Sequence, residues 1–198
     1  MVNVIDLIKC EYIKNDKYYI IPCNSAIGVL YINKKNPTFI SGHLRMRGKD
    51  NGQYPYCYLE MLDDLFGPSQ SIIEVCSNSI QGSKNLTTVD INPKYNPTFV
   101  RNGETLSRIK DNKFDRWRCD PPYNQTTAMK MYGTQLPNTY KLLDAGARVV
   151  KPGSLMFLLL GPVNYQICPK SIKRIGFIAI TIVPNNELRC LHIYIKQK

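Results

Sequence analysis

The sequence lacks the patterns of several common protein classes. Its seven cysteines are an odd number with no C-x-x-C pair, unlike a zinc knuckle or a disulfide framework. Cys10, Cys23, His43 and Cys57 could supply four metal ligands, but their separations are wide and irregular. We therefore expect no metal, and mostly reduced, half-buried thiols.

Long apolar runs are also missing. No stretch reaches the roughly 18 residues of a membrane span. The opening segment MVNVIDLIKCEYIKND places acids and lysines where a signal peptide needs an unbroken apolar core. These absences predict a soluble, intracellular, cytoplasmic protein without a membrane partner.

Acidic residues are scarce: 26 basic residues stand against 15 acidic ones, for a net charge of +11. Such a balance favours a polyanionic partner, first of all nucleic acid. With 198 residues and 43% hydrophobic content, the chain can form one good core with a small appendage.

Residues 1–53 are expected to form a β-rich, basic N-terminal segment. KYYIIPC and AIGVLYINKK have the pattern of extended strands, and the segment 35–53, KNPTFISGHLRMRGKDNGQ, is expected to be a flexible basic loop. The pattern changes from extended to helical at Tyr54, where the second predicted region, 54–198, begins.

That region alternates between two kinds of pattern. PYCYLEMLDDLF, TTAMKMY and NTYKLLDAGARVV have helical spacing, and SNSIQGSKN is expected to be a turn with a short helix. The strand-like runs are SIIEVC, LTTVDIN, TFV, FDRWRC, LMFLLLG, IGFIAITIVP and LRCLHIYIKQ. The alternation predicts an α/β fold, a mostly parallel sheet with helices on both faces.

Polar residues follow four of the predicted strands, in the segments 74–78, 90–92, 102–104 and 120–123. Parallel strands present their carboxyl ends at one edge of the sheet, so these segments are expected to share a site. The last one, DPPY, stops its strand abruptly because proline cannot donate to a sheet ladder. Taken alone, DPPY and the VDINP segment could equally be plain turns.

The order of these motifs resembles the class I methyltransferases that use S-adenosylmethionine, and among them the amino-methyltransferases with a [DNS]PP[YFW] tetrapeptide after the fourth strand. YPYCYLEML resembles the segment before the first strand of adenine-type DNA methyltransferases, NGE follows the third strand and KPGS precedes the fifth. The resemblance covers 54–198. It implies a Rossmann-like, seven-stranded sheet whose last strand is antiparallel.

The resemblance also implies a set of cofactor contacts. Asp90 would accept hydrogen bonds from ribose hydroxyls, and Glu104 would accept one from the adenine amino group, unless NGE is only a turn. The full set of expected S-adenosylmethionine contacts is Tyr54, Pro55, Glu74, Cys76, Asn78, Asp90, Ile91, Glu104 and Asp120.

The first loop departs from the family. EVCSNSIQG lacks the usual glycines after the first strand, although Asn78 tolerates a left-handed conformation and Cys76 and Ser77 are small. A tight turn therefore remains feasible. A methyltransferase-like, nucleic-acid-binding subunit without activity stays open as an alternative.

The catalytic residues implied are Asp120, Pro121, Pro122 and Tyr123. The Asp120 carboxylate and the Pro121 carbonyl would accept the two N–H groups of an adenine amino group in DNA. Tyr123 would stack on the flipped base. RNA amino-methylation is the alternative activity, and methylation of a protein glutamine ranks below both.

Basic residues are expected to contact nucleic acid. The predicted contacts are Lys34, Lys35, Arg45, Arg47, Lys49, Arg116 and Arg118, together with Tyr123. Arg101, Arg108, Lys110 and Lys113 lie near the same motif in sequence, and Tyr54, Tyr56 and Tyr58 add aromatic side chains. DNA enzymes of this type normally carry a separate target-recognition domain, and none is expected here. This suggests relaxed or short sequence recognition, or a protein partner that reads the sequence, and it makes no prediction of the oligomeric state.

Overall fold

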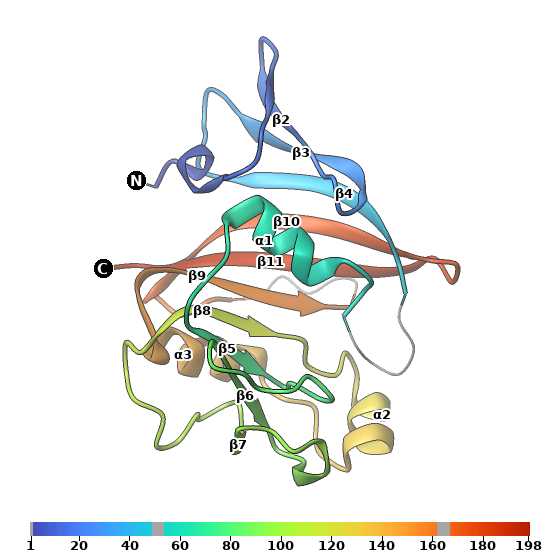
Figure 1. Cartoon of the computed structure of the whole chain (residues 1–198), viewed down its shortest axis with the longest axis vertical. Helices are drawn as coiled ribbons and strands as arrows, with labels where there is room; N and C mark the ends of the chain where they lie inside the picture. Colours follow the sequence, from blue (N-terminus) through green and yellow to red (C-terminus); the bar gives the residue numbers. More distant parts are fainter. Residues whose placement is uncertain (1, 49–53, 162–166) are drawn as a thin grey trace. The chain divides into compact units, whose positions relative to one another are not determined.

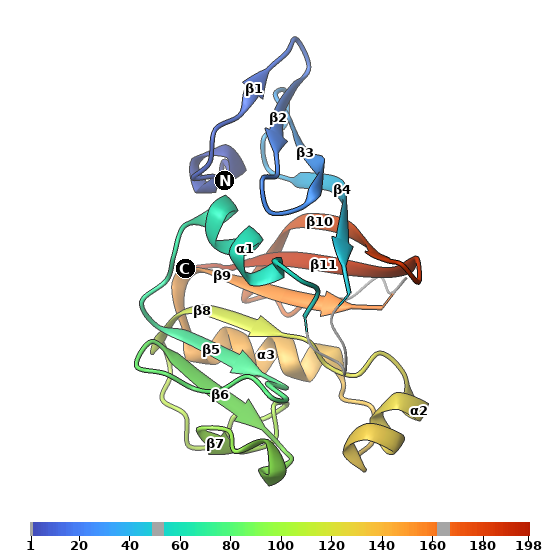
Figure 2. The same ribbon diagram turned by 45° about the vertical axis from the view of Figure 1, so that its right-hand side comes forward.

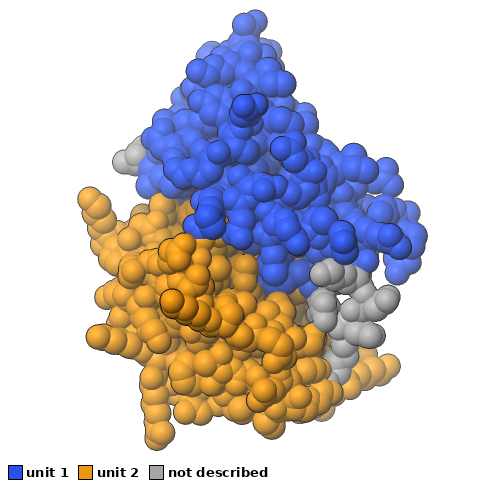
Figure 3. All heavy atoms as spheres, in the orientation of Figure 1, with its two compact units in different colours: residues 1–68, 175–192 blue, residues 69–174, 193–198 orange. Residues whose placement is uncertain are grey.

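The computed structural model describes residues 2–48, 54–161 and 167–198. The chain divides into two compact units, shown in Figure 3. Unit 1 comprises Met1–Pro68 and Ile175–His192, and unit 2 comprises Ser69–Arg174 and Ile193–Lys198. The boundary expected at residue 53 does not coincide with this division, which assigns residues 54–68 to the same unit as the N-terminal strands.

Unit 1 is a mixed sheet with one helix (Figures 1 and 2). Its elements are η1 (Val4–Leu7), β1 (Ile13–Lys14), β2 (Tyr18–Pro22), β3 (Ile27–Asn33), β4 (Ile40–Arg47), α1 (Tyr58–Phe66), most of β10 (Ile172–Val183) and the first part of β11 (Glu187–Lys196). The strands β1 to β4 pair antiparallel in chain order, and β10 pairs parallel with β4.

The segment 35–53 was expected to be a flexible loop, and this prediction is wrong for residues 40–47, which form the strand β4. Leu44 and Met46 are buried, whereas Arg45 and Arg47 between and after them are exposed. This alternation is that of a strand with one covered face. The basic residues that suggested a loop occupy its open side. Lys49 lies outside the described residues.

Unit 2 contains the predicted α/β core. Its elements are β5 (Ile72–Val75), β6 (Leu86–Asp90), η2 (Pro93–Tyr95), β7 (Phe99–Val100), β8 (Phe114–Cys119), α2 (Gln125–Thr127), η3 (Ala128–Tyr132), α3 (Thr139–Val149), β9 (Val150–Leu160) and the end of β11 (Glu187–Lys196). The strand order β7-β6-β5-β8-β9 is parallel at every neighbouring pair (Figure 1). Counted by appearance this order is 3-2-1-4-5, that of a doubly wound, Rossmann-like sheet.

The connections between these strands differ from expectation in two places. The short helix expected within SNSIQGSKN is wrong, since residues 77–85 form turns and one isolated bridge. KPGS lies inside β9, where the pairing with β8 shifts between Phe114 and Arg116. Within the described part of unit 2, α3 is the one helix longer than two turns.

The core of unit 2 depends on a close approach of α3 to the sheet. Trp117 on β8 and Met156 on β9 are fully buried in the apolar cluster that includes Leu142 and Leu143 of α3. A Cβ atom added at Gly146 would lie 2.8 Å from the Trp117 ring and 2.8 Å from Met156 Cε. Glycine is therefore required at this point of the helix by the space available.

We predict that Gly146→Ala destabilises the protein by up to about 2 kcal/mol, because the overpacking cost of about 1–3 kcal/mol outweighs the helix-propensity gain of about 1 kcal/mol. Urea unfolding monitored by Trp117 fluorescence measures the change. The control Asp144→Ala, at an exposed position of the same helix, should be neutral or slightly stabilising. Equal stability of Gly146→Ala and the parent would show that α3 can shift away from the sheet.

Two features are absent from the described residues. No helix among them has the length and apolarity needed to cross a membrane. In the same residues, no three His, Cys, Asp or Glu side chains are arranged to hold a metal ion, so Cys10, Cys23, His43 and Cys57 do not converge there.

Candidate cofactor and substrate site

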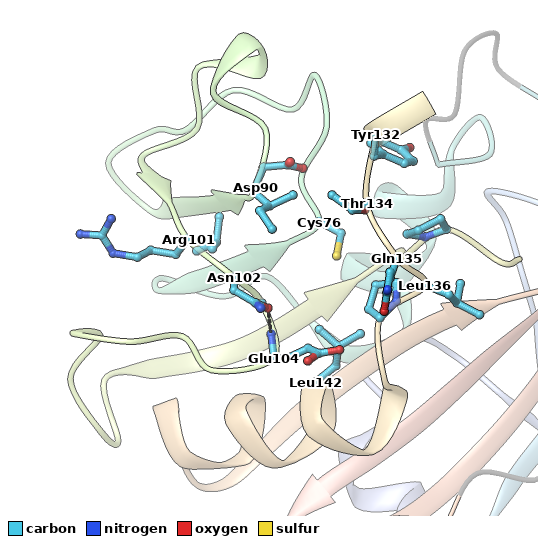
Figure 4. Close-up of a pocket in the computed structure, with 15 residues that line it drawn as sticks. Cys76, Asp90, Arg101, Asn102, Glu104, Tyr132, Thr134, Gln135, Leu136 and Leu142 are labelled. Atoms are coloured by element: carbon cyan, nitrogen blue, oxygen red, sulfur yellow. Dashed lines mark hydrogen bonds between the residues drawn. The ribbon is translucent and has the colours of Figure 1, made fainter. Parts of the chain in front are cut away.

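A cavity of about 280 Å³ lies at the carboxyl ends of the parallel strands of unit 2 (Figure 4). The strand order reverses between β5 and β8, and in open α/β sheets ligands bind beside such a point. The lining consists of Cys76, Val89, Asp90, Ile91, Arg101, Asn102, Gly103, Glu104, Pro122, Tyr132, Thr134, Gln135, Leu136, Pro137 and Leu142. Five predicted site residues are among them: Cys76, Asp90, Ile91, Glu104 and Pro122.

The turn after β5 forms without glycine. Cys76 has φ 56° and Asn78 has φ 47°, so both lie in the left-handed region where glycine is usual. The backbone N–H of Asn78 donates to Asp90 Oδ2 at 2.9 Å, and the N–H of Ser77 donates to the Val89 carbonyl at 3.2 Å. These bonds fasten the turn to the end of β6.

Asp90 is the last residue of β6 and lines the cavity. Its side chain is buried, and its Oδ1 accepts the Asn92 N–H at 2.9 Å while Oδ2 accepts that of Asn78. A carboxylate has about four lone-pair positions, so two bonds of this kind leave capacity for hydroxyl donors from the cavity. In Figure 4 the Asp90 side chain lies at the cavity wall with Cys76.

Glu104 connects the loop after β7 to the start of α3. Its Oε1 accepts the backbone N–H of Asn138, the N-cap residue of α3, at 2.6 Å. Its own N–H donates to Asn102 Oδ1 at 2.8 Å (Figure 4). Between them, Gly103 approaches so closely that an added Cβ would lie 2.6 Å from Val75 Cγ1. These contacts hold the Glu104 carboxylate at the cavity wall.

Tyr132 is a site residue that the sequence analysis missed. It ends the π-helical turn η3, a feature often found at functional sites, and its ring meets that of Tyr95 edge-on at 6.4 Å. Burial raises its pKa to about 12, with Tyr95 and the charges of Asp120 and Asp90 among the further causes. The phenol therefore stays protonated near neutral pH, and its oxygen accepts a hydrogen bond from Asn78 Nδ2 at 3.4 Å.

The DPPY tetrapeptide follows β8 directly. Pro122 lines the cavity, and the Tyr123 hydroxyl donates to Asp120 Oδ1. Tyr123 also lies against Gly161, where an added Cβ would approach its Cβ to 3.1 Å. Of the tetrapeptide, Pro122 is the residue that lines the cavity, and the lining does not include Asp120, Pro121 or Tyr123. The catalytic roles of these three residues stay predictions.

Cys119, the last residue of β8, stays a neutral thiol. Burial raises its pKa well above the ordinary value, and a hydrogen bond with the Cys76 side chain raises it further. A thiolate nucleophile is therefore not available at this position near neutral pH.

Two predicted nucleic-acid contacts are wrong. Arg118 is buried and its Nε donates to Glu74 Oε2 at 2.7 Å, which leaves it inside the sheet rather than at a phosphate. Arg116 is also buried, with its guanidinium 5.5 Å from the centroid of the Phe157 ring. Glu74 is occupied by the same ion pair, and this burial removes the basis for its expected cofactor contact.

The remaining predicted residues lie elsewhere in the chain. Tyr54 and Pro55 are buried in unit 1, where Tyr54 stacks on Tyr58 at 4.6 Å, so their cofactor contact stays a prediction. Lys34 lies 5.6 Å from the Tyr19 ring centroid, and Lys35 is exposed next to it. Lys49 is outside the described residues.

Most of the missed lining comes from the segment 132–137, between η3 and α3. Its sequence, YGTQLP, carries loop-forming Gly and Pro but no recognisable ligand-binding pattern. Val89, Arg101 and Leu142 complete the missed set, and only their position at the end of a strand, after a strand or on the first turns of a helix could have indicated them. Asn102 and Gly103 belong to the segment 102–104 that was expected at the site.

No family model and no curated protein matches the sequence. Among solved structures, the chain is similar to TrmN from Thermus thermophilus, with 11% identity and a TM-score of 0.45 over 65% of this chain and 44% of that one. It is also similar to a SAM-dependent methyltransferase from Methanosarcina mazei, with 12% identity and a TM-score of 0.45 over 65% of this chain and 93% of that one. A third similar structure is the 16S rRNA (adenine(1408)-N(1))-methyltransferase from Catenulisporales acidiphilia, a W203A mutant with cosubstrate SAM. Its identity is 10% and its TM-score is 0.41, over 65% of this chain and 85% of that one. TM-scores below 0.5 do not define a function for this chain.

The left-handed turn gives a stability prediction. Cys76→Gly should be more stable than Cys76→Ala by about 1 kcal/mol, because alanine carries the steric cost of positive φ and glycine does not. Ser77, whose φ is not in the left-handed region, is the matched control, and there the alanine variant should be the more stable one. Urea unfolding of the four variants measures both differences. The same order at both positions would contradict a strained turn at Cys76.

Proposed function

We propose that the protein is an S-adenosylmethionine-dependent methyltransferase that modifies an exocyclic amino group of a base in nucleic acid, with adenine in DNA as the first candidate. One observation carries the proposal: Asp90 and Pro122 of the DPPY tetrapeptide line the same cavity, at the point where the sheet order reverses.

The cavity suits the cofactor. Asp90 retains lone-pair capacity for ribose hydroxyls after its two backbone bonds. The side chains of Ile91, Leu136 and Leu142 offer apolar surface for a nucleoside base. Glu104 stands at the wall as an acceptor for an amino group. The cavity volume of about 280 Å³ is at the lower end of ligand-binding pockets.

The chemistry required of the protein is positioning. S-adenosylmethionine supplies an activated methyl group when bound. The acceptor nitrogen shares its lone pair with the aromatic ring, so it becomes nucleophilic only when acceptors draw its N–H groups away. The Asp120 carboxylate and the Pro121 carbonyl would accept these N–H groups, and the paired prolines keep that carbonyl fixed. The Tyr123 hydroxyl, which donates to Asp120, orients the carboxylate.

Nucleic acid is the substrate class favoured by the charge of +11. The turn formed by Cys76 and Asn78 supports an active enzyme over an inactive subunit, because the missing glycines do not prevent the tight connection after β5.

Asp120→Ala should abolish methyl transfer, with a loss of at least about 100-fold. Cofactor affinity should stay within about threefold of the parent, because Asp120, although it was among the expected cofactor contacts, does not line the cavity. Calorimetry with S-adenosylmethionine and transfer of labelled methyl to nucleic acid measure the two quantities. Asp144→Ala, an exposed acid on α3, is the control for a lost carboxylate. Retained turnover in Asp120→Ala would show that the carboxylate has no role in the reaction.

Asp90→Asn should give the opposite pattern, a loss of cofactor affinity of about tenfold or more, because a carboxylate acceptor for hydroxyl donors is removed. Its folding is checked by circular dichroism, since Asp90 also accepts two backbone N–H groups. Unchanged affinity in the folded variant would place the cofactor elsewhere.

The substrate is identified by mass spectrometry of nucleosides from DNA, ribosomal RNA and transfer RNA after reaction with the purified protein. N6-methyladenine in DNA is the expected product. A methylated amino group found only in RNA would replace the DNA assignment, and no cofactor binding together with no product would overturn the proposed function.

A further inference from the structure

One face of the unit 1 sheet is open to solvent. Side chains alternate across β2, β3, β4 and β10, and the register defines which residues share a face. The buried face carries Ile21, Leu30, Ile32, Leu44, Met46, Ile178, Ile180 and Ile182. The open face carries Tyr18, Ile20, Pro22, Ile27, Val29, Tyr31, Ser41, His43, Arg45, Arg47, Phe177, Ala179, Thr181 and Val183, and these residues are exposed or half-buried.

The open face presents aromatic and apolar surface. Tyr18 and Tyr31 meet edge-on with their ring centroids 5.9 Å apart, and both rings are more than one third exposed. Ile27, the first residue of β3, is 77% exposed. Contiguous exposed surface of this kind is typical of interaction sites.

The same face is positively charged. Arg45 and Arg47 are alternate residues of β4 and share this face with His43. His43 Nε2 lies 2.8 Å from Thr181 Oγ1. No residue of the open face defined above is acidic. Each arginine lies next to an apolar side chain of the same face, because Ile27 pairs with Arg45 and Val183 pairs with Arg47.

A hollow of about 380 Å³ lies at the β4 end of the face, within unit 1. Its lining includes Ile27, Arg45, Arg47, Val183 and Tyr56, whose side chain is 55% exposed and whose backbone N–H donates to the Arg47 carbonyl at 2.8 Å. Ser25 also lines it and donates its hydroxyl to Asp64, so that carboxylate is already engaged. Aromatic, apolar and guanidinium groups thus surround one hollow.

We propose that this face and hollow bind a single-stranded segment of nucleic acid, with phosphates at Arg45 and Arg47 and unstacked bases on Tyr31, Tyr56 and Ile27. Sheet faces that combine exposed aromatic side chains with arginine bind single strands in this way, since every base offers a flat surface to stack on. The base faces of a duplex are stacked on one another, so a duplex would leave these aromatic and apolar side chains uncovered. The inference rests on the proposed function for its ligand class, but it places the ligand on unit 1.

The test measures binding without cofactor, by fluorescence anisotropy of labelled oligo(dT), oligo(U) and a duplex, each of about 12 nucleotides per strand. Both single strands should bind more tightly than the duplex. In the variant Arg45→Ala/Arg47→Ala, Kd should rise about tenfold or more, and the slope of log Kd against log salt should fall by about 1.4, since each single-strand phosphate contact contributes about 0.7.

Tyr31→Leu keeps an apolar side chain but removes the stacking surface, and it should raise Kd about fivefold or more without changing the salt slope. The controls are Lys84→Ala/Lys170→Ala, which removes two exposed charges from unit 2, and Tyr140→Leu on α3; both should bind like the parent. Calorimetry with S-adenosylmethionine should be unchanged in all these variants.

Parent-like Kd and salt slope in the Arg45/Arg47 variant, or preferred binding of the duplex, would overturn the inference. Failure of methyl transfer with single-strand binding intact would count against the proposed function only. Preference for oligo(U) over oligo(dT) would assign the face to RNA, and the reverse would assign it to DNA, and either outcome supports the inference.

Discussion

The geometry of the site depends on a buried ion pair between two neighbouring parallel strands. Glu74 on β5 and Arg118 on β8 are register partners, and their side chains meet at 2.7 Å with 1% and 5% of their surface exposed. Removing one partner would leave an unpaired buried charge, at a cost of about 3–5 kcal/mol. The turn that carries Cys76 and the DPPY tetrapeptide begin within two residues of this pair. Their relative placement therefore follows from how β5 and β8 are held together.

The sequence indicated the strands of unit 2 and the edge where polar residues collect, because apolar runs predict strands and parallel strands share an edge. It could not indicate the ion pair. Arg118 has its partner 44 residues earlier in the chain, and a lone arginine in a strand looks the same whether it points to solvent or to a buried carboxylate. The same ambiguity made Arg116 look like a phosphate contact.

Local pattern failed in a different way at β4 and at the segment 132–137. β4 carries His43, Arg45 and Arg47 on one side, so its polar content resembled a loop, while the buried Ile40, Leu44 and Met46 define a strand only once β3 and β10 pair with it. The segment 132–137 reaches the cavity through η3 and the start of α3, a placement set by tertiary contacts rather than by composition.

The Asp90 side chain both fastens the glycine-poor turn after β5 and lines the cavity. At the left-handed positions of this turn, where glycine is usual, the chain has Cys76 and Asn78. The conformational cost is about 1–2 kcal/mol for Cys76 and less for Asn78, because asparagine tolerates this conformation better. The bond from the Asn78 N–H to Asp90 offsets part of that cost, because it is a charge-assisted bond in a buried setting. Asp90 therefore holds the turn that shapes the cavity, and the same carboxylate faces the cavity as an acceptor. Any ligand that binds there meets a group already fixed in position by the fold.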